Sequence, residues 1–390
     1  MLHAVGASVP RRGDRLTFVE AVSLMVGAGV GAGIMAVPFL AARTGVVELL
    51  AIMAAALAAN CLIHLMLAEV IFRTGRDLQV IELMRLHVFP GRWGWLVWAA
   101  FVLLGLAFVA ILAAYIAGGS EILTSMTGAT GALADGLVYA LCAGVVLLGL
   151  KGVGIFEKAG TVVLVAAVGI IAAGALGVPL RLEWAPAGIW TDALALYGMA
   201  MYALYTFYTV PQVVKGLAPD RRRAVGAVVT GLSVNALLVT IVALVAMGVP
   251  GDVTEVAIVG IAEQVGGWVA IVGSIFIFAA LVTSYWSVSL ALADVIDERT
   301  GIGPRASWLL ATLPSLVLLL LGGWRFLEWL RLAGGATALV VVLISVPMYL
   351  HARRHGDPTA WSLGRWGSGP MLALVVLAAA LMAAGSLLQL

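Results

Sequence analysis

A glycine-rich run followed by proline, GAGVGAGIMAVP at residues 27–38, lies inside an apolar stretch long enough to cross a lipid bilayer. Glycine costs about 1 kcal/mol in a helix interior, and proline removes a backbone hydrogen bond and clashes with the preceding turn. Unwound backbone at membrane depth is tolerated only where protein buries it or where it lines a cavity. The run therefore predicts a broken first helix with a binding site at the break.

The composition assigns the whole chain to the membrane. Hydrophobic residues make up 63% of the 390 positions and charged residues only 11%, against about 25% charged in soluble domains. Three arginines precede the first apolar run, but this run is longer than the apolar core of a signal peptide, so the helix is expected to be retained. Cys61 and Cys142 fall in apolar segments and offer neither a disulfide framework nor metal-ligand spacing.

Apolar spans of about 20 residues predict an all-α integral membrane protein with eleven transmembrane helices. The predicted spans are Phe18–Ala42, Val46–Phe72, Trp93–Ser125, Leu133–Leu150, Thr161–Val178, Ala193–Val214, Ala224–Val249, Trp268–Val295, Ser307–Leu321, Leu332–Leu350 and Met371–Leu390.

The basic residues orient these helices. With a cytoplasmic N-terminus, 18 of the 22 lysines and arginines fall on the cytoplasmic side, and only Arg43, Arg181, Arg325 and Arg331 lie outside. Cytoplasmic loops collect basic residues, and one missed or invented span would spoil this separation. We therefore expect a multi-pass protein of a bacterial or archaeal cytoplasmic membrane, with its C-terminus outside. The basic clusters orient the chain, so the net charge of +2 says nothing about nucleic acid, and no nucleic-acid partner is expected.

The helices fall into two blocks of opposite orientation. Helix 6 carries the polar and aromatic stretch YALYTFYT at 202–209 followed by Pro211, so helices 1 and 6 are both interrupted, each at the start of a block of five. Paired broken helices in inverted repeats are typical of secondary transporters that bind substrate at the midplane. Close helix packing is the alternative use of these glycines. The expected organisation is a tail (1–17), a core (18–350, with repeats at 18–178 and 193–350), and a loop with an extra helix (351–390).

Four segments resemble, in order, helices 1, 3, 6 and 8 of the amino acid/auxin permease family. They are GAGIMAVPFLAARTG (31–45), AAYIAGGSEIL (113–123), YALYTFYTVPQVVKGL (202–217) and FAALVTSYWSVSLALADVI (278–296). The resemblance implies the five-plus-five inverted-repeat fold of the amino acid-polyamine-organocation superfamily, and transport of amino acids coupled to protons or sodium. Thr206 departs from the pattern, because relatives often have glycine in the broken part of helix 6.

An amino acid substrate carries two charges, and burying an unpaired charge is costly. Backbone N–H groups at the start of a half-helix can hold the carboxylate, while exposed carbonyls near Val26, Ala203 and Leu204 can accept from the ammonium. The resemblance implies that Tyr115 adds a hydroxyl; aromatic packing is the alternative for it and for the helix 6 aromatics. The predicted substrate-binding residues are Gly31, Ala32, Gly33, Tyr115, Tyr202, Ala203, Leu204, Tyr205 and Thr206.

A second set of oxygens indicates a sodium site between helices 1 and 8. Ala280, Thr283 and Ser284 have the spacing of one helix face, and carbonyls of Gly27 and Val30 complete five oxygens of the kind that hard cations prefer. The resemblance matches this set to the superfamily's sodium site; ordinary helix-to-helix hydrogen bonding is the alternative. Some proton-coupled relatives place a lysine of helix 5 here, which Thr161–Gly174 lacks, so sodium is the expected coupling ion and no cofactor is expected.

Two further residues each have two possible roles, and two amphipathic segments have a predicted location. His64 is either a proton carrier or a neutral, hydrogen-bonded histidine. Arg43 either pairs with Glu328 as an outer gate or faces lipid headgroups. The amphipathic segments 77–89 and 252–265 are expected to lie at the interface, the second as a lid-like loop.

Together these features predict a cation-coupled symporter of amino acids working by alternating access. The tyrosines of helix 6 favour a large apolar or aromatic amino acid, and an alanine-sized substrate is equally compatible with the backbone site. The sequence shows neither an HExxH motif nor paired mid-span aspartates, which an intramembrane enzyme would need. It also shows no repeated filter loops, which a channel would need. The alternatives are a transporter of another small solute, such as a metal ion, nucleobase or amine, and a proton-coupled permease. The amino acid, the direction of transport and the oligomeric state stay open.

Overall fold

The protein is described here from a computed structural model that covers residues 14–31, 33–129, 131–250, 253, 261–262, 264–322 and 344–388. Within these ranges the regular structure is helical throughout. The helices are α1 (Phe18–Gly29), α2 (Gly33–Ala41), α3 (Val46–Thr74), α4 (Val80–His87), η2 (Gly91–Trp93), α5 (Gly94–Thr127), α6 (Ala132–Val146), α7 (Gly149–Ala175), α8 (Trp190–Ala203), η3 (Phe207–Thr209), α9 (Val210–Leu217), α10 (Arg221–Gly248), α12 (Gly267–Thr300), α13 (Pro304–Gly322), η4 (Gly364–Gly367) and α15 (Gly369–Leu387). Residues 344–355 are also helical.

Eight of the described helical segments are long and apolar enough to cross a membrane. These are α3, α5, α7, the α8–α9 pair, α10, α12, α13 and α15, while α1 and α6 are shorter apolar helices. The predicted first span corresponds to α1 with α2, and the described part of the tenth span is the helix at 344–355. The protein is therefore an integral membrane protein of the predicted all-α type.

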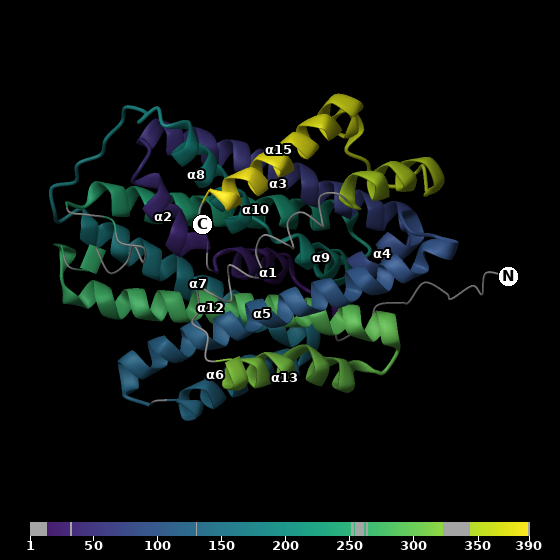
Figure 1. Cartoon of the computed structure of the whole chain (residues 1–390), viewed down its shortest axis with the longest axis horizontal. Helices are drawn as coiled ribbons and strands as arrows, with labels where there is room; N and C mark the ends of the chain where they lie inside the picture. The colour runs from purple at the N-terminus through teal and green to yellow at the C-terminus, as the bar shows by residue number, and fades with distance from the viewer. Residues whose placement is uncertain are drawn as a thin grey trace.

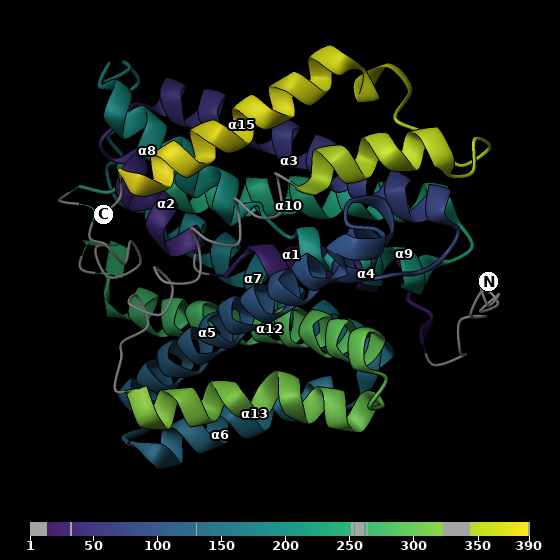
Figure 2. The ribbon, with the colours of Figure 1, turned by 45° about the vertical axis from the view of Figure 1, so that its right-hand side comes forward.

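The packing of the helices follows the inverted repeat. The third members of the two blocks, α5 and α12, pack against each other, α1 packs against α10, and the corresponding α8 packs against α3. In Figures 1 and 2, α1 lies near the centre of the molecule, with α6 and α13 on one side of it and α3, α8 and α15 on the other. The broken helices of the two repeats thus occupy the interior.

The additional helix α15 lies on the first half of helix 6. It packs against α8 and α3, and its Gly385 faces Gly198 of α8. A Cβ added to Gly198 would lie 2.9 Å from the backbone of Gly385, and one added to Gly385 would overlap the carbonyl oxygen of Leu194. Small residues let membrane helices approach closely, so this contact fixes α15 outside the repeats.

The beginning of α1 is held by a capping box and an ion pair. Thr17 N–H donates to Glu20 Oε2 at 2.7 Å, and the Glu20 N–H donates to the Thr17 hydroxyl at 3.3 Å. Lys151 Nζ of α7 then bonds both Glu20 carboxylate oxygens, at 2.7 and 2.6 Å. These contacts anchor α1, the first half of helix 1, to α7, which corresponds to the predicted helix 5.

The predicted boundary between helices 4 and 5 was wrong. The predicted spans ended at Leu150 and began at Thr161, whereas α6 ends at Val146 and α7 already begins at Gly149. Lys151, Glu157 and Lys158 therefore lie on a helix rather than in a loop. The charges misled the prediction because Lys151 is paired with Glu20, Glu157 is buried inside the protein and Lys158 is exposed.

The two amphipathic segments have different outcomes. Residues 77–89 contain the predicted helix, α4, whose Val80, Ile81 and Leu83 are buried. Of residues 252–265, most lie outside the described residues. The predicted N-terminal tail is described only from residue 14.

A buried charge cluster joins α3 to the C-terminal part of the chain. Glu69 is fully buried, and Arg73 Nε donates to its Oε1 at 2.7 Å. Its Oε2 accepts from the Tyr349 hydroxyl at 3.0 Å and from the Leu363 N–H at 2.8 Å, and Arg353 Nε lies 3.8 Å from Oε1. The carboxylate is thus the shared acceptor for three separate chain segments.

We expect Arg73→Gln to lower the stability of the protein, because it leaves the buried Glu69 carboxylate without its closest cation. Breaking a buried ion pair costs about 3 kcal/mol. The measurement is thermal unfolding of the purified protein in detergent, with Arg354→Gln, an exposed arginine of the same region, as the matched control. Equal unfolding temperatures for the two variants would contradict this account.

Candidate functional site

The first helix is broken where the sequence predicted. α1 ends at Gly29, Val30 caps it by donating its N–H to the Val26 carbonyl at 2.9 Å, and α2 begins at Gly33. Gly31 lies in the break, and the predicted site residue Ala32 lies outside the described residues. The proline that suggested the break, Pro38, lies inside α2 and not in the unwound part.

Glycines line the break because neighbouring groups come too close for a side chain. A Cβ on Gly33 would overlap the backbone and Cβ of Ala203, and a Cβ on Gly29 would overlap the side-chain amide of Asn235. Helices 1 and 6 therefore touch through their backbones. This close approach is the structural use of the glycine run.

Helix 6 is broken at residues 204–206. α8 ends at Ala203, η3 covers Phe207–Thr209, and α9 begins at Val210. Thr206, which replaces the glycine of many relatives, has φ of −119° and ψ of 27°, which needs no glycine. The break thus forms with a threonine because its backbone stays out of the left-handed region.

Side chains of helices 2 and 7 bond the backbone groups around this break. Asn235 Nδ2 of α10 donates to the Ala203 carbonyl at 3.0 Å, and Asn60 Nδ2 of α3 lies 3.3 Å from the Met201 carbonyl. Thr206 donates its N–H to His64 Nε2 at 3.1 Å. Buried backbone groups in a membrane need such partners, so these side chains make the break stable.

These contacts also assign a role to His64. Its Nδ1 lies 2.6 Å from the Asn60 carbonyl, so it donates there, and Nε2 acts as acceptor for the Thr206 N–H. A ring with one donor and one acceptor nitrogen is neutral. The fully buried His64 therefore fits a hydrogen-bonded structural residue rather than a proton carrier.

The predicted substrate residues lie at both breaks. A Cβ on Gly31 would lie 2.5 Å from Ser284 Oγ and 3.2 Å from the Tyr115 hydroxyl, so Tyr115 faces the unwound part of helix 1. Tyr208, which the prediction left out, donates its hydroxyl to the Ala28 carbonyl at 3.3 Å. Tyr202 is half-buried near the end of α8. Phenol groups thus surround the break from helices 3 and 6.

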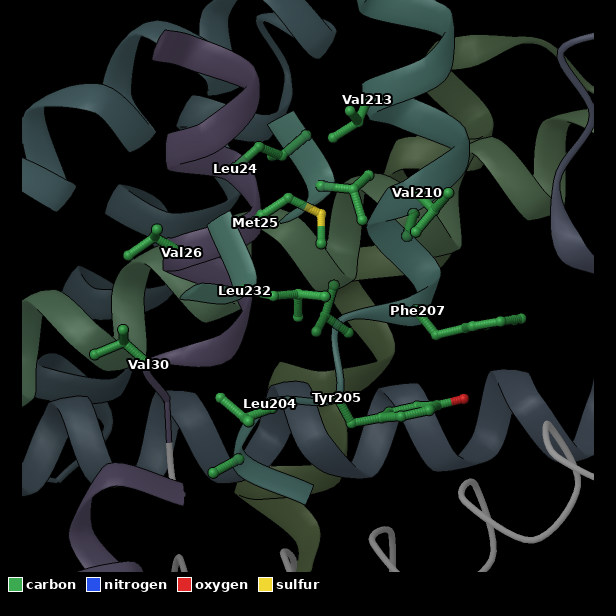
Figure 3. Close-up of a cluster of buried hydrophobic side chains, with 14 of the residues drawn as sticks. Leu24, Met25, Val26, Val30, Leu204, Tyr205, Phe207, Val210, Val213 and Leu232 are labelled. Carbon is green, nitrogen blue, oxygen red and sulfur yellow. The ribbon is translucent and has the colours of Figure 1, made fainter. Parts of the chain in front are cut away.

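The helix 6 aromatics form a separate group. The rings of Tyr205 and Phe207 stack with centroids 6.0 Å apart and planes 8° apart, and both project in the same direction from the break (Figure 3). The His64 ring meets both of them edge-on. Tyr205, Phe207 and Tyr208 line a narrow, mainly apolar cleft that extends toward Gln79 and Val295. Tyr205 therefore faces this cleft.

Four of the five predicted cation ligands come together. The Gly27 carbonyl accepts from the Ser284 hydroxyl at 2.8 Å and lies 3.4 Å from the Thr283 hydroxyl. Thr283 also lies 3.2 Å from the Ala280 carbonyl, and Val30 is buried one turn beyond Gly27. The arrangement joins α1 to α12 and is compatible both with a cation site and with helix-to-helix hydrogen bonding.

Two residues of this region were missed from the sequence, Glu157 and Ser287. Glu157 of α7 is fully buried against Gly27, and the Ser287 hydroxyl of α12 donates to its Oε1 at 2.7 Å. The sequence signal for them was the segment GLKGVGIFEKAG (149–160), in which apolar residues and glycines separate the charged residues and lead directly into the predicted helix 5. Of the proposed outer gate, Glu328 lies outside the described residues and Arg43 lies over the Phe39 ring at 4.6 Å.

Comparison with known families identifies the group to which this chain is related. Residues 15–385 match the model of the tryptophan/tyrosine permease family. The chain belongs to this family. The amino acid/auxin permease family, which its motifs resemble, is not the family that the match names. No curated protein matches the chain in sequence.

A solved structure of Mhp1, a nucleobase-cation-symport-1 family transporter in a closed conformation with bromovinylhydantoin bound, has a similar fold. The TM-score is 0.67 at 14% identity, over 97% of this chain and 93% of that one. This similarity supports the transporter fold with two inverted five-helix repeats. This tryptophan/tyrosine permease family member is thus a multi-pass membrane permease.

Substitution of Gly33 tests the contact between the two broken helices. We expect Gly33→Ala to lower the unfolding temperature, because its methyl group must displace the backbone of Ala203, and overpacking costs about 1–3 kcal/mol. Gly105→Ala in α5 is the matched control, since nothing lies within 4 Å of a Cβ there. If thermal unfolding in detergent shows no difference between these variants, the backbones are not in contact.

Proposed function

We propose that this family member is a cation-coupled secondary transporter of amino acids, with large aromatic amino acids as substrates, that works by alternating access. The observation that carries the proposal is the meeting of two broken helices at a buried site, with the Tyr115 hydroxyl beside Gly31 and the Tyr208 hydroxyl on the Ala28 carbonyl. The family match to tryptophan/tyrosine permeases supports an aromatic substrate.

The break in helix 1 offers the donors that a carboxylate requires. The N-terminus of α2 begins at Gly33, where free N–H groups and the helix dipole favour an anion. The Tyr115 hydroxyl beside Gly31 adds a further donor. In this proposal, residues 31–33 and Tyr115 hold the substrate carboxylate.

The substrate ammonium requires acceptors, which the ends of the half-helices supply. The Ala203 carbonyl already accepts from Asn235 and the Val26 carbonyl from the Val30 N–H, but each carbonyl oxygen has a second lone pair. The proposed acceptors are the carbonyls of Ala203, at the end of α8, and of Leu204, the first residue of the break. The half-buried Tyr202 and the ring of Tyr205 would then contact the aromatic side chain of the substrate.

The coupling cation is assigned to the oxygens between α1 and α12. Gly27, Ala280, Thr283 and Ser284 provide carbonyl and hydroxyl oxygens that suit sodium. Gly27 lies near the end of α1 and Gly31 lies in the break, about one helical turn further along the sequence. Binding of the cation would therefore fix the same segment that binds the substrate.

Uptake of radiolabelled substrates into proteoliposomes tests the proposal. We expect saturable uptake of tryptophan, tyrosine or phenylalanine, with weak or no uptake of uracil and hydantoins. Tyr115→Phe should raise KM about tenfold, because a hydrogen bond to a charged group is worth about 1.5–3 kcal/mol. Tyr139→Phe, whose hydroxyl lies 3.3 Å from Thr312 on the α6–α13 side, is the control and should leave KM unchanged.

Two results would contradict the proposal. Absence of saturable uptake of any amino acid would remove the amino acid assignment. Saturable uptake of a nucleobase or hydantoin in its place would establish the other small-solute alternative.

A further inference from the structure

Glu157 of α7 is a buried acidic residue to which the proposed function gives no role. We propose that Glu157 binds the coupling cation, and that this carboxylate, rather than the neutral oxygens alone, provides the charge of the site. The inference rests on the proposed function, because it names the residue through which a cation gradient acts.

The two carboxylate oxygens have unequal surroundings. Oε1 accepts a hydrogen bond from the Ser287 hydroxyl of α12 at 2.7 Å. Oε2 is buried, has no hydrogen-bond partner among the described residues, and lies directly against Gly27 of α1, where any Cβ would overlap it. A buried carboxylate oxygen without a partner is costly. Oε2 is therefore aimed at the predicted cation ligands.

No described basic side chain forms an ion pair with Glu157. Lys158, its neighbour in sequence, is exposed, and Lys151 of the same helix is paired with Glu20. Tyr208, whose hydroxyl donates to the Ala28 carbonyl, is a titratable group on the helix 6 side of the same region. Besides Glu20, the charged residues on the other helices packed against α7 lie toward the helix ends: Asp135, Lys215, Arg221, Arg222, Arg223, Asp294, Asp297, Glu298 and Arg299. The remaining titratable groups on these helices are Tyr139, Cys142 and Tyr285.

The neutral oxygens around Gly27 complete a site for one positive charge. Its carbonyl is within 2.8 Å of the Ser284 hydroxyl and 3.4 Å of the Thr283 hydroxyl. A single cation neutralises one carboxylate, whereas a divalent ion would leave an excess charge in a low-dielectric interior. The occupant is thus monovalent. Sodium would use the two hydroxyl oxygens as well, and a proton would need only the carboxylate.

The position of Glu157 makes the cation a link among three helices. α7 contributes the carboxylate, α1 contributes Gly27 at the base of the break, and α12 contributes Ser287 and the two hydroxyls. With the charge neutralised, α7 and α1 can stay in close contact. Without a cation, an unpaired carboxylate disfavours this packing. Occupancy of the site therefore favours the arrangement in which the break of helix 1 is formed.

The first experiment measures cation binding without any substrate. Thermal unfolding of purified wild-type protein, Glu157→Gln and Glu183→Gln is followed with sodium chloride or N-methylglucamine chloride at fixed pH, and then across pH without sodium. Glu183 is exposed and serves as the matched control. We expect the wild type and the control to be stabilised by sodium or by acidification, and Glu157→Gln to lose that response.

The second experiment separates coupling from substrate binding. In proteoliposomes, we expect Glu157→Gln to retain exchange of labelled for unlabelled substrate and to lose accumulation driven by the sodium or the pH gradient, whichever drives the wild type. Glutamine keeps the shape of the side chain and cannot carry its charge. The double variant Thr283→Ala with Ser284→Ala distinguishes the two cations, since it abolishes sodium-driven and spares proton-driven accumulation.

Each negative result has a separate meaning. If Glu157→Gln still accumulates substrate along the same gradient, or keeps the cation response of its unfolding temperature, the assignment of Glu157 is overturned. If the wild type exchanges no amino acid but shows a cation response that depends on Glu157, the proposed substrate fails and the cation site stands. Should Glu157→Gln not be recovered as a monodisperse protein, Glu157→Asp is measured with the same expectation of altered cation response.

Discussion

Two helix breaks inside a membrane leave backbone N–H and C=O groups without their helical partners, and the surrounding protein must supply a hydrogen-bond partner for each of them. Water is absent there, and each unsatisfied N–H or C=O costs several kcal/mol. At the break of helix 6, the donors and acceptors come from Asn60 and His64 of α3 and from Asn235 of α10. These side chains come from the corresponding helices of the two repeats, so the inverted topology itself brings the polar partners to the break.

Close packing is the second consequence of the breaks. Gly29 and Gly33 approach Asn235 and Ala203 so closely that no side chain fits between them, and Gly27 is in contact with the Glu157 carboxylate. The glycine run therefore lets one short segment contact helix 6 (α8), helix 7 (α10) and helix 5 (α7). Cation and substrate binding can influence each other through this segment because both would use it.

Much of the fold was predictable from composition and periodicity, and some of the site was not. Glycines or polar residues inside an apolar span indicate a helix break, so both breaks could be located from residues 27–33 and 202–209. The start of α7 was missed because charges usually mark loops, whereas Lys151 and Glu157 are accommodated by contacts with α1 and α12. Asn235 was missed because a single asparagine in an apolar span gives no sign of which distant carbonyl it bonds.

In the proposed mechanism, backbone N–H groups at the break of helix 1 bind the substrate carboxylate. The decisive experiment is a structure of the reconstituted protein with a bound aromatic amino acid. We expect the carboxylate to lie against the N–H groups of residues 31–33 and within hydrogen-bond distance of the Tyr115 hydroxyl. A carboxylate held instead by a basic side chain, or a ligand bound only in the cleft beside Tyr205 and Phe207, would contradict it.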